Sequence, residues 1–139
     1  MIWLTPSRVT LATTTLSHVE SVSIDRFASR FVEEWSDLGP YQVFADVAHE
    51  RVVCRVVRAI TTDDDSRYSA PALGAQVMLA FETAPTASDA RRTSVEITLV
   101  IRSVEHTPHP TRGIRQTITG VAISSDGATD PIIESEVTP

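Results

Sequence analysis

The stretch that decides the fold is residues 19–60, which read VESVSIDRFASRFVEEWSDLGPYQVFADVAHERVVCRVVRAI. It contains two long runs without internal Gly or Pro, hinged at Gly39 and Pro40. Strands in globular proteins are usually about 5–6 residues long, so runs of this length extend beyond what one small core can cover. We expect this stretch to be a scaffold arm that packs against copies of the same chain.

The first run is compatible with two kinds of secondary structure. Phe27, Phe31 and Trp35 recur every four residues, as on one face of a helix, and Asp25 is suited to cap its start. The same aromatic residues also lie on one side of a strand, because their spacing is even. Periodicity alone favours a helix over residues 26–38 and leaves the strand open.

The rest of the chain reads as strands joined by polar connections. The run from Arg51 to Ile60 is apolar on both faces, which indicates cover on both sides, the second supplied by a neighbouring copy. Strands are expected over residues 8–16, 19–24, 51–60, 75–83, 93–105 and 114–124. Connections are expected at 61–73, 84–91 and 106–113, with an acidic, mobile tail over 126–139.

This pattern predicts a mainly β fold for a single domain over residues 1–139. It is expected to be an antiparallel β-sandwich or small barrel with a long hairpin and at most one short helix. Two-sided apolar strands leave edges that aggregate unless partners cover them, and ordered self-assembly is one way to cover them.

Composition narrows the function classes. The formal net charge of −6 disfavours binding to nucleic acid or to an anionic membrane surface. No apolar run approaches the roughly 20 residues that span a bilayer, and the first residues lack the basic flank of a secretion signal. Cys54 lies in an apolar run and is expected to be buried. Because it is the single cysteine, neither an internal disulfide nor a cysteine zinc site is possible.

Charge is unevenly distributed along the chain. Residues 126–139 hold four acidic residues and no base, whereas five Arg residues lie in 91–115. A second acidic cluster is Asp63, Asp64 and Asp65. Patches of opposite charge favour head-to-tail docking between identical subunits, although such patches are often simply solvated.

Motifs for chemistry are sparse. His106 and His109 are three residues apart, but the Pro-containing extended segment between them holds two imidazoles poorly for a shared ion. The segment from Asp126 to Asp130 lacks the alternating oxygen ligands of a calcium loop and is read as a turn. The sequence has no Gly-rich phosphate loop and no nucleophile elbow. We therefore expect no catalytic residues, no metal site and no cofactor.

Three segments resemble the tail tube proteins of tailed bacteriophages. They are VSIDR at 22–26, WSDLGPYQVFAD at 35–46 followed by 52–57, and TGVAISSDGATDP at 119–131. The resemblance implies hexameric rings that stack into a tube, each copy lending a long hairpin to one closed inner barrel. It implies that DNA passes through without being bound, that the other partners are tail proteins and no membrane, and that the protein is assembled in the host cytoplasm and resides in the virion tail.

The resemblance also implies roles for charged residues, and it favours the strand over the helix for residues 26–38. The acidic residues of the first arm would face the lumen and repel phosphates. The charged loops would stack one ring on the next. The lumen candidates are Glu20, Asp25, Glu33, Glu34 and Asp37, and the stacking candidates are Asp63, Asp64, Asp65, Arg91, Arg92, Arg112 and Arg115.

Other functions stay open on the sequence. A tail terminator or a baseplate ring component has a related architecture. A monomeric cellular β-sandwich binding module belongs to a different class. An enzyme is the weakest alternative because it rests on the two histidines alone.

Overall fold

The computed structural model describes residues 2–4, 7–12, 14–16, 18–60, 72–83, 92–109 and 113–137. Within these residues the chain forms strands and no helix. The strands are β1 (Ile2–Leu4), β2 (Ser7–Leu11), β3 (Thr14–Thr15), β4 (Val19–Trp35), β5 (Gln42–Ile60), β6 (Gln76–Thr83), β7 (Arg92–His109), β8 (Gly113–Ala122) and β9 (Ile132–Val137). The predicted mainly β, antiparallel fold is confirmed.

β4 and β5 form the long hairpin that the sequence predicts. They pair antiparallel from Val19 opposite Arg58 to Trp35 opposite Gln42, and the turn holds Gly39 and Pro40. The helical interpretation of residues 26–38 is therefore wrong. The aromatic residues that suggested it are separated by even numbers of residues, which a regular strand also places on one side, although register shifts after Ala28 and after Glu34 interrupt this alternation in β4.

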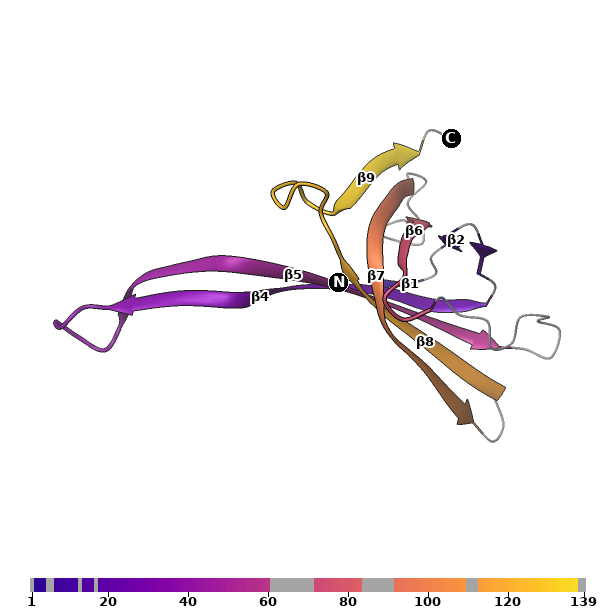
Figure 1. Cartoon of the computed structure of the whole chain (residues 1–139), viewed down its shortest axis with the longest axis horizontal. Coiled ribbons are helices and arrows are strands. Elements are labelled where there is room, and N and C mark those ends of the chain that lie inside the picture. Colours follow the sequence, from indigo (N-terminus) through magenta and orange to yellow (C-terminus); the bar gives the residue numbers. More distant parts are fainter. Residues whose placement is uncertain are drawn as a thin grey trace.

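The strands belong to one sheet that is open rather than closed into a barrel. Its order is β1-β4-β5-β8-β7-β6-β2-β3, and β9 pairs with β7 off this path. The sheet curls around its own inner face to form a body, from which the outer half of the β4–β5 hairpin projects (Figure 1). We call residues 27–51 the arm.

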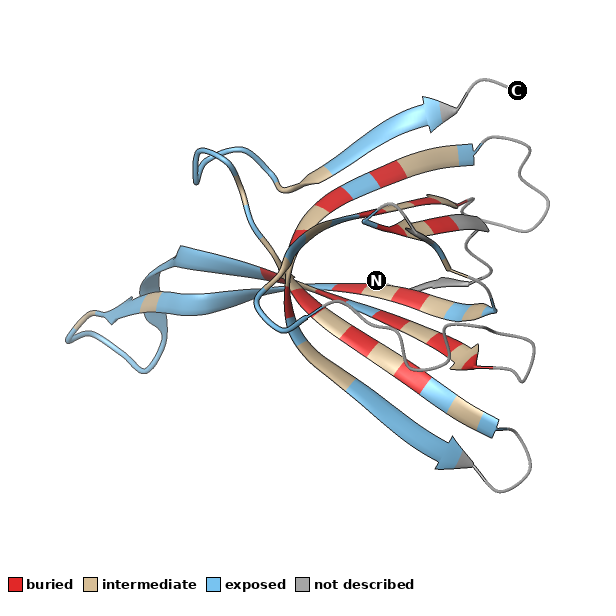
Figure 2. Cartoon of the chain, turned by 45° about the vertical axis from the view of Figure 1, so that its right-hand side comes forward, coloured by how far each residue is buried: buried red, intermediate tan, exposed pale blue. Residues whose placement is uncertain are grey.

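The core lies on the concave side of the body. In the body, buried and partly exposed residues alternate along β4 to β8, so one face of each strand is shielded from solvent. Phe81, Leu79 and Leu99 are almost completely buried in it, and the burial stops where the arm begins (Figure 2). Cys54 lies in this core as predicted, and desolvation raises its thiol pKa to about 12.

Three predicted boundaries need correction. The first strand is divided into β2 and β3. β7 runs on to His109, through residues expected to form a connection. Pro108 fits there because β6 pairs with β7 only as far as Val100, so the missing Pro N–H removes no bond on that side. The tail is not free over its whole length, because residues 132–137 form β9 and pair with Arg92–Ile97 of β7.

Candidate functional site

The arm exposes an unusual amount of apolar surface. Trp35 is 55% exposed, Val43 66% and Leu38, at the turn, 97%. The large apolar side chains exposed over residues 27–47 are Phe27, Phe31, Trp35, Leu38, Tyr41, Val43, Phe44 and Val47. Such concentrated apolar exposure is typical of an interaction surface.

The arm has two faces of different character. Residues directly opposite in an antiparallel pair share a face, so Phe31 lies with Val47, and Glu33 with Ala45. On the other face Val32 lies opposite Asp46, and Glu34 opposite Phe44. The first face carries one acidic residue in these pairs and the second carries two. Neither face is purely acidic.

The arm also presents free strand edges. β1 pairs with β4 only over Ser21–Ser23, and β8 pairs with β5 only from Val53 onwards. In the part of the chain that the structure describes, no strand covers the outer edges of residues 27–35 and 42–52. Unpaired edges of this length are templates for strand addition by another chain.

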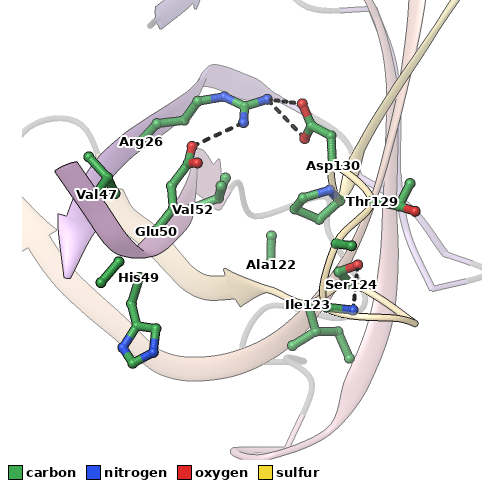
Figure 3. A pocket seen from close by; sticks show the side chains of 14 residues that line it. Arg26, Val47, His49, Glu50, Val52, Ala122, Ile123, Ser124, Thr129 and Asp130 are labelled. Atoms are coloured by element: carbon green, nitrogen blue, oxygen red, sulfur yellow. Dashed lines mark hydrogen bonds and ion pairs between the residues drawn. The ribbon is translucent and has the colours of Figure 1, made fainter. Parts of the chain in front are cut away.

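A pocket of about 740 Å³ lies where the arm leaves the body (Figure 3). One wall comes from β4 and β5, and the other from the end of β8 and the loop after it. We call it the root pocket. Its lining residues are Arg26, Val47, Ala48, His49, Glu50, Val52, Ala122, Ile123, Ser124, Gly127, Ala128, Thr129, Asp130 and Pro131.

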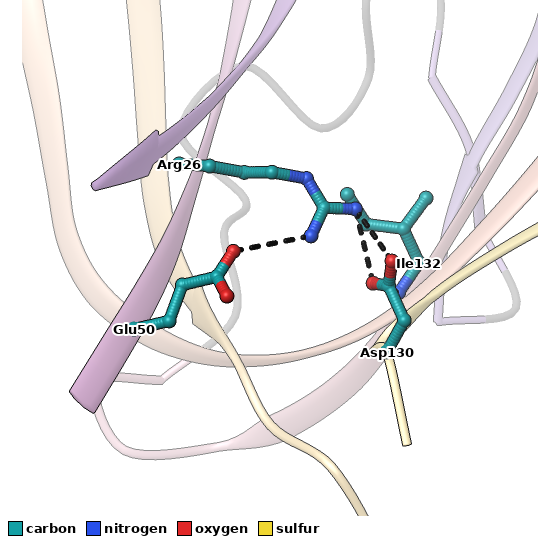
Figure 4. A network of polar contacts seen from close by, with 4 residues as sticks. All are labelled: Arg26, Glu50, Asp130 and Ile132. Carbon is teal, nitrogen blue, oxygen red and sulfur yellow. Dashed lines mark hydrogen bonds and ion pairs between the residues drawn. The ribbon is translucent and has the colours of Figure 1, made fainter. Parts of the chain in front are cut away.

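An arginine bridges three segments at one side of this pocket (Figure 4). Arg26 Nη2 donates to both carboxylate oxygens of Asp130, at 3.0 and 2.8 Å, and Arg26 Nη1 donates to Glu50 Oε1 at 3.4 Å. We call Arg26, Glu50 and Asp130 the root clasp. It joins β4, β5 and the loop before β9.

The clasp favours the charged forms of Arg26 and Asp130. The hydrogen bond that Arg26 donates to Asp130 is the largest cause that raises the pKa of Arg26. The pKa of Asp130 is lowered, first by the backbone N–H of Ile132, which donates to Oδ1 at 2.9 Å, and then by Arg26. Both side chains remain about half exposed, so solvent screens the attraction between them.

The loop over residues 123–131, which we call the detour loop, is organised around Asp126. Its carboxylate accepts hydrogen bonds from Ser124 Oγ, from the backbone N–H groups of Ala128 and Thr129, and from Thr129 Oγ1. These bonds, with the Thr129 hydroxyl first, hold the pKa of Asp126 well below its usual range. The predicted turn is confirmed.

The predicted lumen residues do not form one surface. Glu33 and Glu34 project to opposite faces of the arm, because neighbours along a strand alternate. Asp37 lies in the exposed turn at the tip. Asp25 lies on β4 opposite Val53, at the level of the body. Glu20 lies further into the body and pairs with Arg115, whose Nε is 2.9 Å from Glu20 Oε2.

The predicted stacking residues are described only in part. Arg92 opens β7 opposite Val137, whereas Arg115 lies opposite Thr107 near the other end of that strand. The structure therefore does not bring these two arginines together. The remaining candidates, Asp63, Asp64, Asp65, Arg91 and Arg112, lie outside the described residues.

The histidine pair falls on β7. His106 Nε2 lies 3.0 Å from Gln116 Nε2, and Gln116 Oε1 accepts a 2.6 Å hydrogen bond from Arg58 Nε. Arg58 and Gln116 are both buried. This row crosses β5, β8 and β7. Over the described ranges, no group of three or more His, Cys, Asp or Glu side chains is placed to hold a metal ion.

The sequence analysis missed the root clasp. Arg26 and Asp130 are 104 residues apart, and no role was predicted for either side chain. Nothing in the sequence pairs them.

Comparison with protein-family models found no match, and comparison with curated protein sequences found none either. Among the residues that the structure places, none belongs to a helix long and apolar enough to cross a membrane.

Proposed function

We propose that this chain is a structural subunit of a bacteriophage tail tube, which forms stacked hexameric rings around a passage for DNA. The observation that carries the proposal is the arm, a hairpin that leaves its own core with both edges unpaired and apolar side chains on both faces. An isolated hairpin of this kind is marginal in water. Partners that pair with its edges and pack against its faces would remove both the unpaired edges and the exposed apolar surface.

The strand directions suit a closed ring. In a ring of parallel arms, β5 of one copy lies beside β4 of the next and runs antiparallel to it, as neighbouring strands do within the hairpin. The contact is head to tail, so it forms a ring when the rotation between neighbouring copies closes and an open filament when it does not. Closure into a common barrel leaves no exposed edge.

The charges support a conduit that DNA traverses without being held. The net charge is −6, and the arm carries five acidic residues, among them Glu33, Glu34 and Asp46 on its two faces, against two arginines, Arg30 and Arg51. Carboxylates repel phosphates, whereas arginines along the bore would bind them. The role requires no turnover and no cofactor, and it places the protein in the virion tail after assembly in the host cytoplasm.

The test is direct observation of the purified chain at increasing concentration by size-exclusion chromatography and negative-stain microscopy. Stacked rings with a bore wide enough for duplex DNA support the tube. Rings that never stack indicate a terminator or baseplate component instead. A compact monomer at every concentration overturns the proposal and favours a binding module.

A matched variant replaces residues 29–49 with Asn-Gly, which closes a two-residue hairpin between Ala28 and Glu50. The body should fold and stay monomeric. Rings formed by this variant would show that the arm is not the assembly element.

A further inference from the structure

The root clasp sits at a discontinuity in the sheet. β8 and β9 run in the same direction along one edge of β7, with Ala122 opposite Leu99 and Ile132 opposite Ile97. The whole detour loop, residues 123–131, therefore stands opposite Thr98 alone. A chain that continued along the edge of β7 from β8 straight into β9 would not need this loop. The loop therefore has a role outside the pairing with β7.

The detour loop reaches toward the arm. Toward the arm, the last residue of β5 that pairs with β8 is Val53, which lies opposite Val121. The detour loop begins just after Val121. The loop lines the root pocket opposite β4 and β5 (Figure 3). Its last part places Asp130 against Arg26, two residues beyond the buried Ile24 and opposite the buried Val52. The contact is therefore made at the level where the arm separates from the body.

The loop is suited to act as a support because its shape is set internally. Asp126 closes it on one side, and Gly127 adopts a φ of 78°, which the absence of a side chain permits. Asp130 Oδ1 also accepts from the Ile132 N–H, so its position is fixed to the start of β9. The carboxylate is thus fixed by the Ile132 N–H on one side while both of its oxygens accept from Arg26 Nη2 on the other (Figure 4).

We infer that Arg26 is the positioning residue of the arm, and that its paired hydrogen bonds to Asp130 fix the direction in which the arm leaves the body. An exposed ion pair adds little to stability. The guanidinium contacts Asp130 through Nη2 and Glu50 through Nη1, so its plane is fixed between two segments, and this restricts orientation more than the energy of the contacts indicates. The inference rests on the proposed function for its purpose, since a ring closes only if every arm points the same way.

The test measures arm direction in the monomer. Spin labels are attached at Leu38→Cys, in the turn at the tip, and at Met78→Cys, on the exposed side of β6. Cys54 is buried and stays unlabelled, which labelling of the unsubstituted chain verifies. The otherwise unchanged protein should give one narrow distribution of distances between the labels.

Asp130→Asn and Arg26→Gln should each lose this narrow distribution and give a broad one. Arg26→Lys should broaden it as well, because a single ammonium nitrogen cannot hold Asp130 and Glu50 through two nitrogens of one plane. The variant that carries both Asp130→Asn and Arg26→Gln should give a distribution no broader than that of either single variant. Both substitutions remove the same contact between Arg26 and Asp130. An unchanged distribution in Asp130→Asn overturns the inference, as does a broad distribution before any clasp residue is changed.

The matched control is Glu20→Gln, which removes a second exposed ion pair from the same strand, with Arg115. It should leave the distribution narrow. Broadening in this variant would mean that loss of any β4 ion pair loosens the arm, and would also overturn the inference. Far-ultraviolet circular dichroism confirms that each variant keeps its strands.

Assembly separates this inference from the function on which it rests. If the clasp variants broaden the distribution and form fewer rings, both proposals are supported. If they broaden it but the unsubstituted chain never forms rings, the positioning role stands and the tail tube proposal fails. If the unsubstituted chain forms rings and the clasp variants keep a narrow distribution, the positioning role fails alone.

Discussion

Arg115 Nε lies 2.9 Å from Glu20 Oε2, and this ion pair joins β8 to β4. The family resemblance implies a lumen role for the glutamate and a stacking role for the arginine. Because each is the partner of the other, their charges are largely compensated on one surface of the body. The charge available to line a passage is therefore concentrated further along β4 and β5, in the arm.

Apolar contacts of the arm should drive self-association. Burying a phenylalanine side chain is worth about 1.5–3 kcal/mol, and each 1.4 kcal/mol or so corresponds to a factor of about ten in the association constant. Phe31→Ser should therefore weaken self-association by about tenfold or more in sedimentation velocity. Met78→Ser removes a similarly exposed residue from β6 and should have little effect. Equal weakening by both variants would contradict a specific role of the arm.

The same residue type should contribute very differently to the body and to the arm. Phe81 is buried in the core, and Phe81→Ala should lower the free energy of unfolding by about 3–5 kcal/mol. Phe44 is about half exposed on the arm, and Phe44→Ala should change the monomer by about 0.5 kcal/mol or less. Urea unfolding of monomeric protein measures both. A large loss in Phe44→Ala would mean that the arm folds back onto the core.

Glu33 and Glu34 should differ in what they do within a tube, because they lie on opposite faces of the arm. Reversal to Arg of the residue that faces the passage should slow genome exit from assembled particles. Reversal of the other should place a charge in a packed interface and lower the yield of particles. Ejection kinetics and particle counts, measured on the two single variants, distinguish these effects. Identical behaviour of the two variants would argue against a tube in which one face of the arm lines the passage and the other lies in a packed interface.

The root clasp should weaken in acid. The pKa of Asp130 is lowered in the folded chain, so its contribution is present above the unfolded aspartate pKa of about 3.9 and is lost as pH falls through the folded value. The stability difference between the unsubstituted chain and Asp130→Asn should therefore shrink as the pH is lowered below about 3.9. Urea midpoints over a pH series measure it. A difference that stays constant in acid would show that the charge of Asp130 does not matter.

Local patterns predicted most of the strands and the hinge at Gly39 and Pro40, whereas only the family resemblance favoured a strand over a helix for residues 26–38. The Gly39-Pro40 hinge and the alternation in β4 to β8 reflect neighbours in sequence, which is the information that propensity and periodicity carry. The helix over residues 26–38 was wrong because a spacing of four residues satisfies both periods. Full pairing of β4 with β5 decided the outcome, and that pairing depends on tertiary structure.

The parts that could not be predicted depend on distant segments. β9 has a short acidic sequence that reads as a solvated tail, and it becomes a strand because β7 offers it an edge beyond the end of β8. The contact of Arg26 with Asp130 likewise exists only because the detour loop brings the end of the chain to the root of the arm. Neither event leaves a periodic signal in the sequence.

The order of strands also bears on how quickly the protein acquires its shape. β2 pairs with β6, which joins Thr10 to Ala80, 70 positions apart in the chain, whereas the hairpin arises from adjacent segments. Loop-closure entropy makes such distant pairing slow, while hairpins form within microseconds. A newly synthesised copy would then expose its apolar arm well before its body is complete. The local concentration of nascent chains, more than final stability, therefore sets the risk of misassembly.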